Sequence, residues 1–211
     1  MEFRYFGWNA PAVSFWGINF MTILGAWALY DQKSIIVAKA SGKSAAIPWF
    51  LYYVFMLVSF VVYGISELDF PFLFHGLVRG ALHFLILLEL KKFRSFRKRD
   101  VWLGRALLLA LIAMIFAPFK EFFFLAFAFG GVASVATQVS EIRREKSSGV
   151  VSIRLLAVYT LSSFFWVFYG WEFEKHDILA TGVAYLAVFL VTIGFWLKFR
   201  EKGERYAVAP H

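Results

Sequence analysis

Long apolar runs, separated by short polar stretches, dominate the pattern of this sequence. The runs are continuous rather than alternating, so they predict helices and not the strands of about ten residues that a membrane barrel needs. Crossing a bilayer as a helix takes roughly 20 apolar residues. Seven transmembrane helices are therefore predicted, at 10–30, 45–65, 70–90, 101–117, 121–138, 150–171 and 178–197.

The sequence also repeats itself at an offset of 106 residues. Polar and glycine positions carry the match, because shared Leu or Phe positions mean little in so apolar a chain. The matched pairs include Gly25 with Gly131, Gln32 with Gln138, Tyr53 with Tyr159, Tyr63-Gly64 with Tyr169-Gly170, and Gly76 with Gly182. Duplicated hydrophobic halves are typical of transporters, which bind their substrate between the repeats.

The repeat divides the chain into four parts. Three helices (10–90) form the first repeat, 101–117 is an unmatched helix, and three further helices (121–200) form the second repeat. A three-helix unit crosses the membrane an odd number of times, so the unmatched helix makes both repeats parallel. The predicted fold is an all-α membrane protein in a 3+1+3 arrangement, with a linker helix that does not touch substrate. The tail 201–211 is expected to be flexible and cytosolic.

Composition agrees with a membrane protein. The chain is 61% hydrophobic and 17% charged, whereas soluble domains carry about 25% charged residues. The net charge of +8 would favour a nucleic-acid partner in a soluble protein, but here we expect no nucleic acid. Of the 22 Lys and Arg residues, 17 fall in the tail and in the loops near 31–44, 91–100 and 141–154. The positive-inside rule then predicts a cytosolic C-terminus and an N-terminus that is outside or lumenal.

Each repeat carries the same polar signature after its first helix. The first reads Asp31-Gln32-Lys33-Ser34 and then Gly42-Lys43-Ser44, and the second reads Thr137-Gln138-Val139-Ser140 and then Lys146-Ser147-Ser148-Gly149. An apolar helix ending in Tyr-Gly follows in both. This doubled set resembles the PQ-loop superfamily, which includes the SWEET and SemiSWEET sugar transporters, lysosomal amino-acid exporters and the KDEL receptor.

The resemblance covers about residues 12–200. It implies a SWEET-like carrier, a uniporter that moves a small polar solute such as a sugar by alternating access between two three-helix bundles. Asp31 and Thr137 stand where the superfamily has its proline. His75 and Thr181 stand where its sugar-transporting members commonly keep an Asn, so a simple hexose site is not implied.

A second resemblance is confined to the first repeat. Ile47-Pro48-Trp49-Phe50 and Asp69-Phe70-Pro71-Phe72 are similar to a small membrane domain found at the N-terminus of lipid A biosynthesis proteins. That similarity implies the same broad fold with a lipid-linked sugar as substrate. Two alternatives therefore stay open beside the carrier: handling of a lipid-linked sugar, and a receptor of the KDEL-receptor type that binds cargo without net transport.

Three ionisable residues of the third helix suggest a binding site. His75, Arg79 and His83 are spaced at i, i+4 and i+8 and so share one helix face. A mid-membrane arginine is costly unless it faces a cavity or a partner. The pattern favours a substrate-binding stripe in which Arg79 pairs an anionic group and His75 hydrogen-bonds or takes a proton. The alternative is a structural Arg79 that contacts a backbone carbonyl or Glu89, with histidines that only pack.

Thr181 and Tyr185 are the repeat mates of His75 and Arg79, so hydroxyl groups would face the cationic pair. The remaining candidates for substrate binding are aromatic or amide side chains of the other helices: Tyr53, Tyr159, Trp166 and Asn19. Trp49 is expected at the membrane interface, where tryptophan is common.

Gln32 and Gln138 lie near the cytosolic ends of the first helix of each repeat. Their duplication favours a hinge or gating role through helix-end hydrogen bonds. The sequence has no Cys, no Gly-x-Ser-x-Gly and no phosphate-binding loop. We therefore expect neither an enzyme nor a bound metal or cofactor. The expected partners are the solute and membrane lipids, and a homo-oligomer stays open.

The predicted topology can be tested by labelling, because a chain without Cys gives no background. A cysteine placed at Ser95 lies in the most basic loop and should be shielded in intact cells and react after permeabilisation. Reaction of Ser95→Cys with an impermeant maleimide in intact cells would contradict the cytosolic assignment of that loop.

Overall fold

The computed structural model describes residues 8–200, which form seven α-helices and no strand. Six of the helices, all except α4, are long and apolar enough to cross a membrane, and they indicate an integral membrane protein. The predicted tail 201–211 lies outside the described residues. The helices are α1 (Ala10–Ala38), α2 (Ile47–Ser66), α3 (Phe70–Phe93), α4 (Lys98–Phe116), α5 (Lys120–Glu145), α6 (Ile153–Glu172) and α7 (His176–Phe199).

All seven segments predicted from the sequence are helical, and the largest differences are at two helix ends. The helix α1 runs to Ala38 and α5 to Glu145, eight and seven residues beyond the apolar runs. Lys, Gln, Glu and Arg are good helix formers, so a helix continues after the sequence turns polar. Gln32 lies in the extension of α1, and Gln138, the last residue of its predicted segment, lies within α5.

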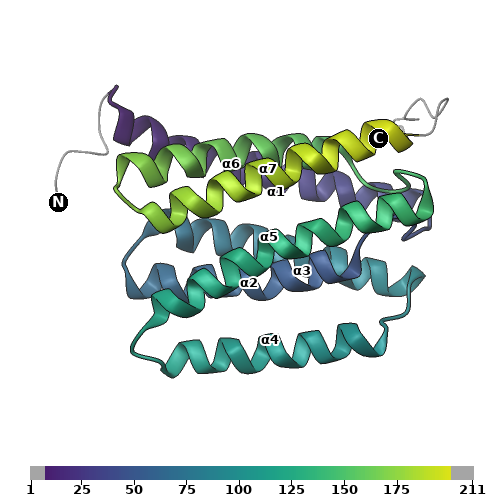
Figure 1. The fold of residues 1–211 in the computed structure, drawn as a ribbon, viewed down its shortest axis with the longest axis horizontal. Helices are drawn as coiled ribbons and strands as arrows, with labels where there is room; N and C mark the ends of the chain where they lie inside the picture. The colour runs from purple at the N-terminus through teal and green to yellow at the C-terminus, as the bar shows by residue number, and fades with distance from the viewer. Residues whose placement is uncertain (1–7, 201–211) are drawn as a thin grey trace.

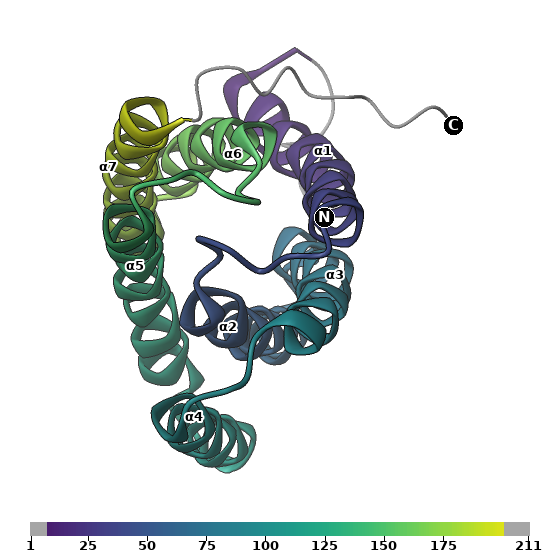
Figure 2. The ribbon, with the colours of Figure 1, turned by 90° about the vertical axis from the view of Figure 1, so that its right-hand side faces the viewer.

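Six helices close into a ring around the long axis of the molecule (Figures 1 and 2). Going round the ring, α1 contacts α3, α3 contacts α2, α2 contacts α5, α5 contacts α7, α7 contacts α6, and α6 contacts α1. The helix α4 lies outside the ring against α2 and α5. The loops after α1, α3 and α5 lie together at what we call the basic end, and those after α2, α4 and α6 lie at the opposite end.

Glycines allow neighbouring helices to approach closely at equivalent places in the two halves. A Cβ on Gly76 in α3 would collide with the backbone of α2 at Leu57 and Val61. A Cβ on Gly182 in α7 would make a tight contact, at 3.0 Å, with α6 at Val167, the repeat mate of Val61. Small residues at such contacts are a general feature of helix packing in membranes.

Gln32 joins α1 to the second half of the chain at the basic end. It is buried, its Nε2 donates to the carbonyl of Val150 at 2.8 Å, and its Oε1 accepts from the backbone N–H of Ser152 at 2.8 Å. Both partners precede α6, where backbone groups have no partner within the helix. One side-chain amide thus satisfies a donor and an acceptor of the backbone.

Gln138 makes the equivalent pair of bonds from the second half of the chain to the first. Its Nε2 donates to the carbonyl of Ser44 at 2.5 Å, and its Oε1 accepts from the N–H of Ala46 at 2.9 Å. Ser44 and Ala46 precede α2 and are the repeat mates of the residues that Gln32 binds. The two glutamines form a reciprocal pair, which we call the glutamine clasps.

Asp31, the residue before Gln32, strengthens the first clasp. Its carboxylate accepts from the hydroxyl of Ser152 at 2.7 Å and pairs with Arg154 at 2.9 Å. Ser152 also caps the first turn of α6, where its hydroxyl accepts from the N–H of Leu155. Asp31 therefore adds a link between α1 and α6.

Removing one clasp should destabilise the protein measurably. In Gln138→Leu the buried N–H of Ala46 and the carbonyl of Ser44 lose their partner, at a cost of about 1–3 kcal/mol for each group. Thermal unfolding of the purified protein in detergent should show a clearly lower midpoint. The matched control is Ser140→Ala, two residues away and exposed, which should unfold like wild type. Equal midpoints for the two variants would show that the clasp does not contribute.

Candidate functional site

An internal cavity of about 60 Å³ lies inside the helix ring, with room for a few water molecules. Its walls come from α2, α3, α5, α6 and α7. Seven of the eight residues predicted to bind substrate line it: Tyr53, His75, Arg79, Tyr159, Trp166, Thr181 and Tyr185. The eighth, Asn19, is buried in α1 outside the lining, and its amide donates to the carbonyl of Phe15 at 2.9 Å.

Arg79 is the charged residue of the cavity wall and is only 3% exposed. Its Nη2 donates to the carbonyl of Met21 and, at 3.3 Å, to the hydroxyl of Ser162. Its guanidinium carbon lies 4.8 Å from the ring centre of Tyr159, a cation–π contact. Its Nε has no hydrogen-bond partner among residues 8–200.

These contacts combine the two interpretations of Arg79 that the sequence left open. The carbonyl contact to α1 belongs to the structural interpretation, and the position in the cavity wall belongs to the binding interpretation. Glu89, the other structural partner considered, pairs instead with Lys92 at 2.8 Å. The guanidinium is therefore held by neutral groups.

Two glycines make room for the repeat mates Arg79 and Tyr185. A Cβ on Gly25 in α1 would occupy the space of the Arg79 guanidinium, and a Cβ on Gly131 in α5 would overlap the Tyr185 hydroxyl. Gly25 and Gly131 are themselves repeat mates. The duplicated glycine noted in the sequence thus leaves space for a large polar side chain on the third helix of each half. We call this pair of glycines, Gly25 and Gly131, the glycine shelf.

The side chains that fill these two spaces, Arg79 and Tyr185, differ in chemistry. The Tyr185 hydroxyl donates to the carbonyl of Ala128 at 2.9 Å and lies 3.0 Å from the sulfur of Met56. Met56 is the repeat mate of Ser162, which Arg79 contacts. A cation and a serine on one side therefore correspond to a phenol and a thioether on the other, and the cavity is electrostatically asymmetric.

The histidines of α3 are both buried and both bonded. His75 Nδ1 lies 3.0 Å from the hydroxyl of Thr22, which donates to the carbonyl of Ile18. His83 Nδ1 donates to the carbonyl of Arg79 at 2.8 Å, and its Nε2 lies 3.1 Å from the Tyr159 hydroxyl. Only His75 lines the cavity. Because a carbonyl can only accept, the His83 Nε2 accepts from Tyr159 when the ring is neutral.

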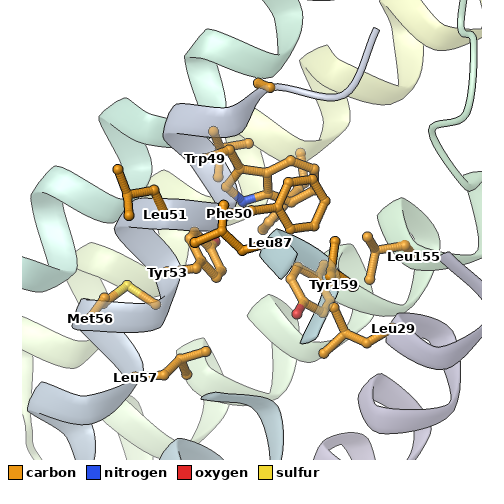
Figure 3. Packing of buried hydrophobic residues seen from close by; sticks show 14 of the residues in the cluster. Leu29, Trp49, Phe50, Leu51, Tyr53, Met56, Leu57, Leu87, Leu155 and Tyr159 are labelled. Carbon is orange, nitrogen blue, oxygen red and sulfur yellow. The ribbon is translucent and has the colours of Figure 1, made fainter. Parts of the chain in front are cut away.

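Aromatic rings lie toward the basic end of the cavity. The rings of Tyr53 and Tyr159, which are repeat mates, stack 6.1 Å apart. Trp49 is fully buried and lies 5.9 Å from Tyr53 and 6.4 Å from Tyr159 (Figure 3). The prediction that Trp49 sits at the membrane interface is therefore wrong. Its position near the start of α2 resembles an interfacial one, but α2 lies inside the bundle there.

An ion pair crosses between the halves at the opposite end. Lys175 Nζ lies 2.6 Å from the Asp69 carboxylate, which also accepts from the hydroxyl of Tyr169 at 3.0 Å. Asp69 and Lys175 are repeat mates, so the contact joins equivalent loops. We call these three residues the outer clasp.

Sequence reasoning missed several wall residues. Ser162 and Ser163 interrupt an apolar helix, and that adjacent pair of hydroxyls was an available signal. Phe60, Phe72 and Phe124 also line the cavity, but nothing distinguishes them in a chain with 27 Phe residues.

No protein-family model, no curated protein and no solved structure matches this chain. The functional interpretation therefore depends on the geometry of the fold and the cavity.

The glycine shelf can be tested with a single methyl group. Gly25→Ala should displace the Arg79 guanidinium and destabilise the protein by about 1–3 kcal/mol, the usual cost of overpacking. Gly131→Ala should act similarly through Tyr185. Gly194→Ala is the control, since its Cβ meets no atom within 4 Å and alanine favours a helix. Midpoints of thermal unfolding in detergent measure the effect, and three equal midpoints would contradict the shelf.

Proposed function

We propose that this protein is a SWEET-like carrier that moves a small polar solute by alternating access between two three-helix bundles. In this proposal α1–α3 and α5–α7 are the parallel repeats, and α4 is the seventh membrane crossing and the linker. The N-terminus is outside or lumenal, and the basic end is cytosolic. The cavity between the repeats is the substrate site.

The pattern of helix contacts supports the division into repeats. Shifting helix numbers by four maps the α1–α3 contact onto α5–α7, and the α2–α3 contact onto α6–α7. The two contacts between the halves, α1 with α6 and α2 with α5, map onto each other. Among the described residues α4 contacts only α2 and α5 and contributes nothing to the cavity wall, as a linker helix would.

The surface of α4 favours a place in the bilayer in spite of its four charged residues. These all lie in its first half, toward the basic end: Lys98, Arg99, Asp100 and Arg105. Arginine side chains near a helix end can extend to the interface. Its second half exposes large apolar side chains suited to lipid: Leu108, Leu109, Ile112, Ile115 and Phe116.

The observation that carries the proposal is the cavity shared by both halves, with a clasp between the halves beyond each of its ends. Substrate sites at a repeat interface near mid-membrane are typical of carriers that rock one repeat against the other. The outer clasp is held by side-chain contacts alone, which can open while the glutamine clasps hold the basic end. Such an arrangement lets the end at the outer clasp open while the basic end stays closed.

Flux measurements test the carrier directly. The purified protein is reconstituted in liposomes, and the uptake and counterflow of radiolabelled small sugars and organic acids are compared with empty liposomes. A carrier accelerates the exchange of at least one solute that it also binds. Binding without any exchange would refute the carrier and identify a receptor. Exchange of a lipid-linked sugar alone would identify the third alternative.

The outer clasp yields a separate prediction about opening. Asp69→Lys places two cations together, and a charged hydrogen bond of about 1.5–3 kcal/mol is lost. The open state should gain roughly tenfold or more in population. The readout is the rate at which a cysteine at Ile178, in the cavity wall, reacts with a soluble methanethiosulfonate. The double variant Asp69→Lys/Lys175→Asp should restore the slow rate, and an unchanged rate in Asp69→Lys would contradict the clasp.

A further inference from the structure

The cavity holds a permanent positive charge without a counter-ion. Arg79 lines the wall and is 3% exposed, and no Asp or Glu is among the lining residues within the described range 8–200. Its protein contacts are a carbonyl, a hydroxyl and an aromatic ring. The acidic residue Asp69 at the outer clasp is already paired with Lys175.

Such a charge is costly at this position. An arginine side chain stays protonated in proteins, and an ion in a medium of low dielectric pays a large desolvation penalty unless a counter-charge is close. Neutral partners offset part of that penalty. An anion in the cavity would offset much more, so the ligand that gains most from this site is negatively charged.

Two hydrogen-bond donors beside the cavity have no acceptor in the described part of the chain. Arg79 Nε–H is buried and has no partner among residues 8–200. The Ser162 oxygen accepts from Arg79 at 3.3 Å, so its own hydrogen is available for a second bond. A carboxylate can accept several hydrogen bonds on its two oxygens. The remaining wall is mostly aromatic, from residues such as Phe60, Phe72 and Trp166, and would pack against an uncharged body.

We propose that the ligand of this cavity is a small organic monoanion, a monocarboxylate, whose carboxylate pairs with Arg79 and Ser162. This inference deepens the proposed carrier function and rests on it for the transport of the anion. The volume of about 60 Å³ suits a compact molecule. A free solute is favoured over a lipid headgroup, because each helix of the ring contacts both of its neighbours and a lipid tail needs a lateral opening.

The first test compares ligands that differ only in charge. Lactate and lactamide, and glucuronate and glucose, are titrated into purified wild-type protein by calorimetry in detergent. In at least one pair the carboxylate should bind at least tenfold more tightly than its neutral partner. Equal or weaker binding of both carboxylates would overturn the proposal. This comparison uses only wild-type protein, so it tests the preference for a carboxylate even if a substitution prevents folding.

The second test assigns the preference to Arg79. Arg79→Gln should lose the preference for the carboxylate, and Arg79→Lys should keep part of it because a cation remains. The matched control is Arg105→Gln, which removes the same charge from an exposed site on α4 and should bind like wild type. A preference that survives intact in folded Arg79→Gln, or that disappears in Arg105→Gln, would overturn the assignment.

The last arm separates this inference from the carrier and from a lipid source. Lactate that binds through Arg79 but does not move in proteoliposomes supports the anion site and refutes the carrier. Flux of glucose with no binding of either carboxylate supports the carrier and overturns the anion site. Nanodiscs with and without phosphatidic acid test the source. Binding of this lipid that requires Arg79, with no binding of lactate in nanodiscs that lack the lipid, would overturn the free solute.

Discussion

The reciprocal hydrogen bonds of Gln32 and Gln138 are the interaction on which the assembly of this protein depends. Polar backbone groups in or near a bilayer need partners within the protein, and the segments before α2 and α6 find theirs on the opposite repeat. Each half therefore completes the other. The clasps fix α1 against α6 and α5 against α2, and these two contacts close the ring that encloses the cavity.

Within that frame the two halves differ in chemistry at equivalent positions. Gly25 and Gly131 leave equal space beside the third helices, yet one space holds Arg79 and the other Tyr185. A cavity between identical halves would offer a ligand the same groups twice. The difference at this one layer gives the cavity a charged side and a neutral side.

The ends of the cavity differ in what holds them. The glutamine clasps bind backbone groups, and Asp31 adds an ion pair to Arg154. The outer clasp consists of side chains only, with Asp69 between Lys175 and Tyr169. Contacts between side chains can exchange for water without unravelling a helix end. In the proposed carrier, this difference favours the outer end as the one that opens with the smaller structural change.

The sequence by itself determined the helices and most of the polar side chains of the cavity wall, because apolar run length and the cost of a buried charge act locally along the chain. It also placed His75 and Arg79 on one face of α3. Tertiary structure alone decided that Trp49 is buried and that Asn19 lies outside the lining. The repeat offset identifies equivalent positions, whereas contacts join different positions across the two halves, as between Gln32 and Val150. Which residues meet there depends on how the ring closes.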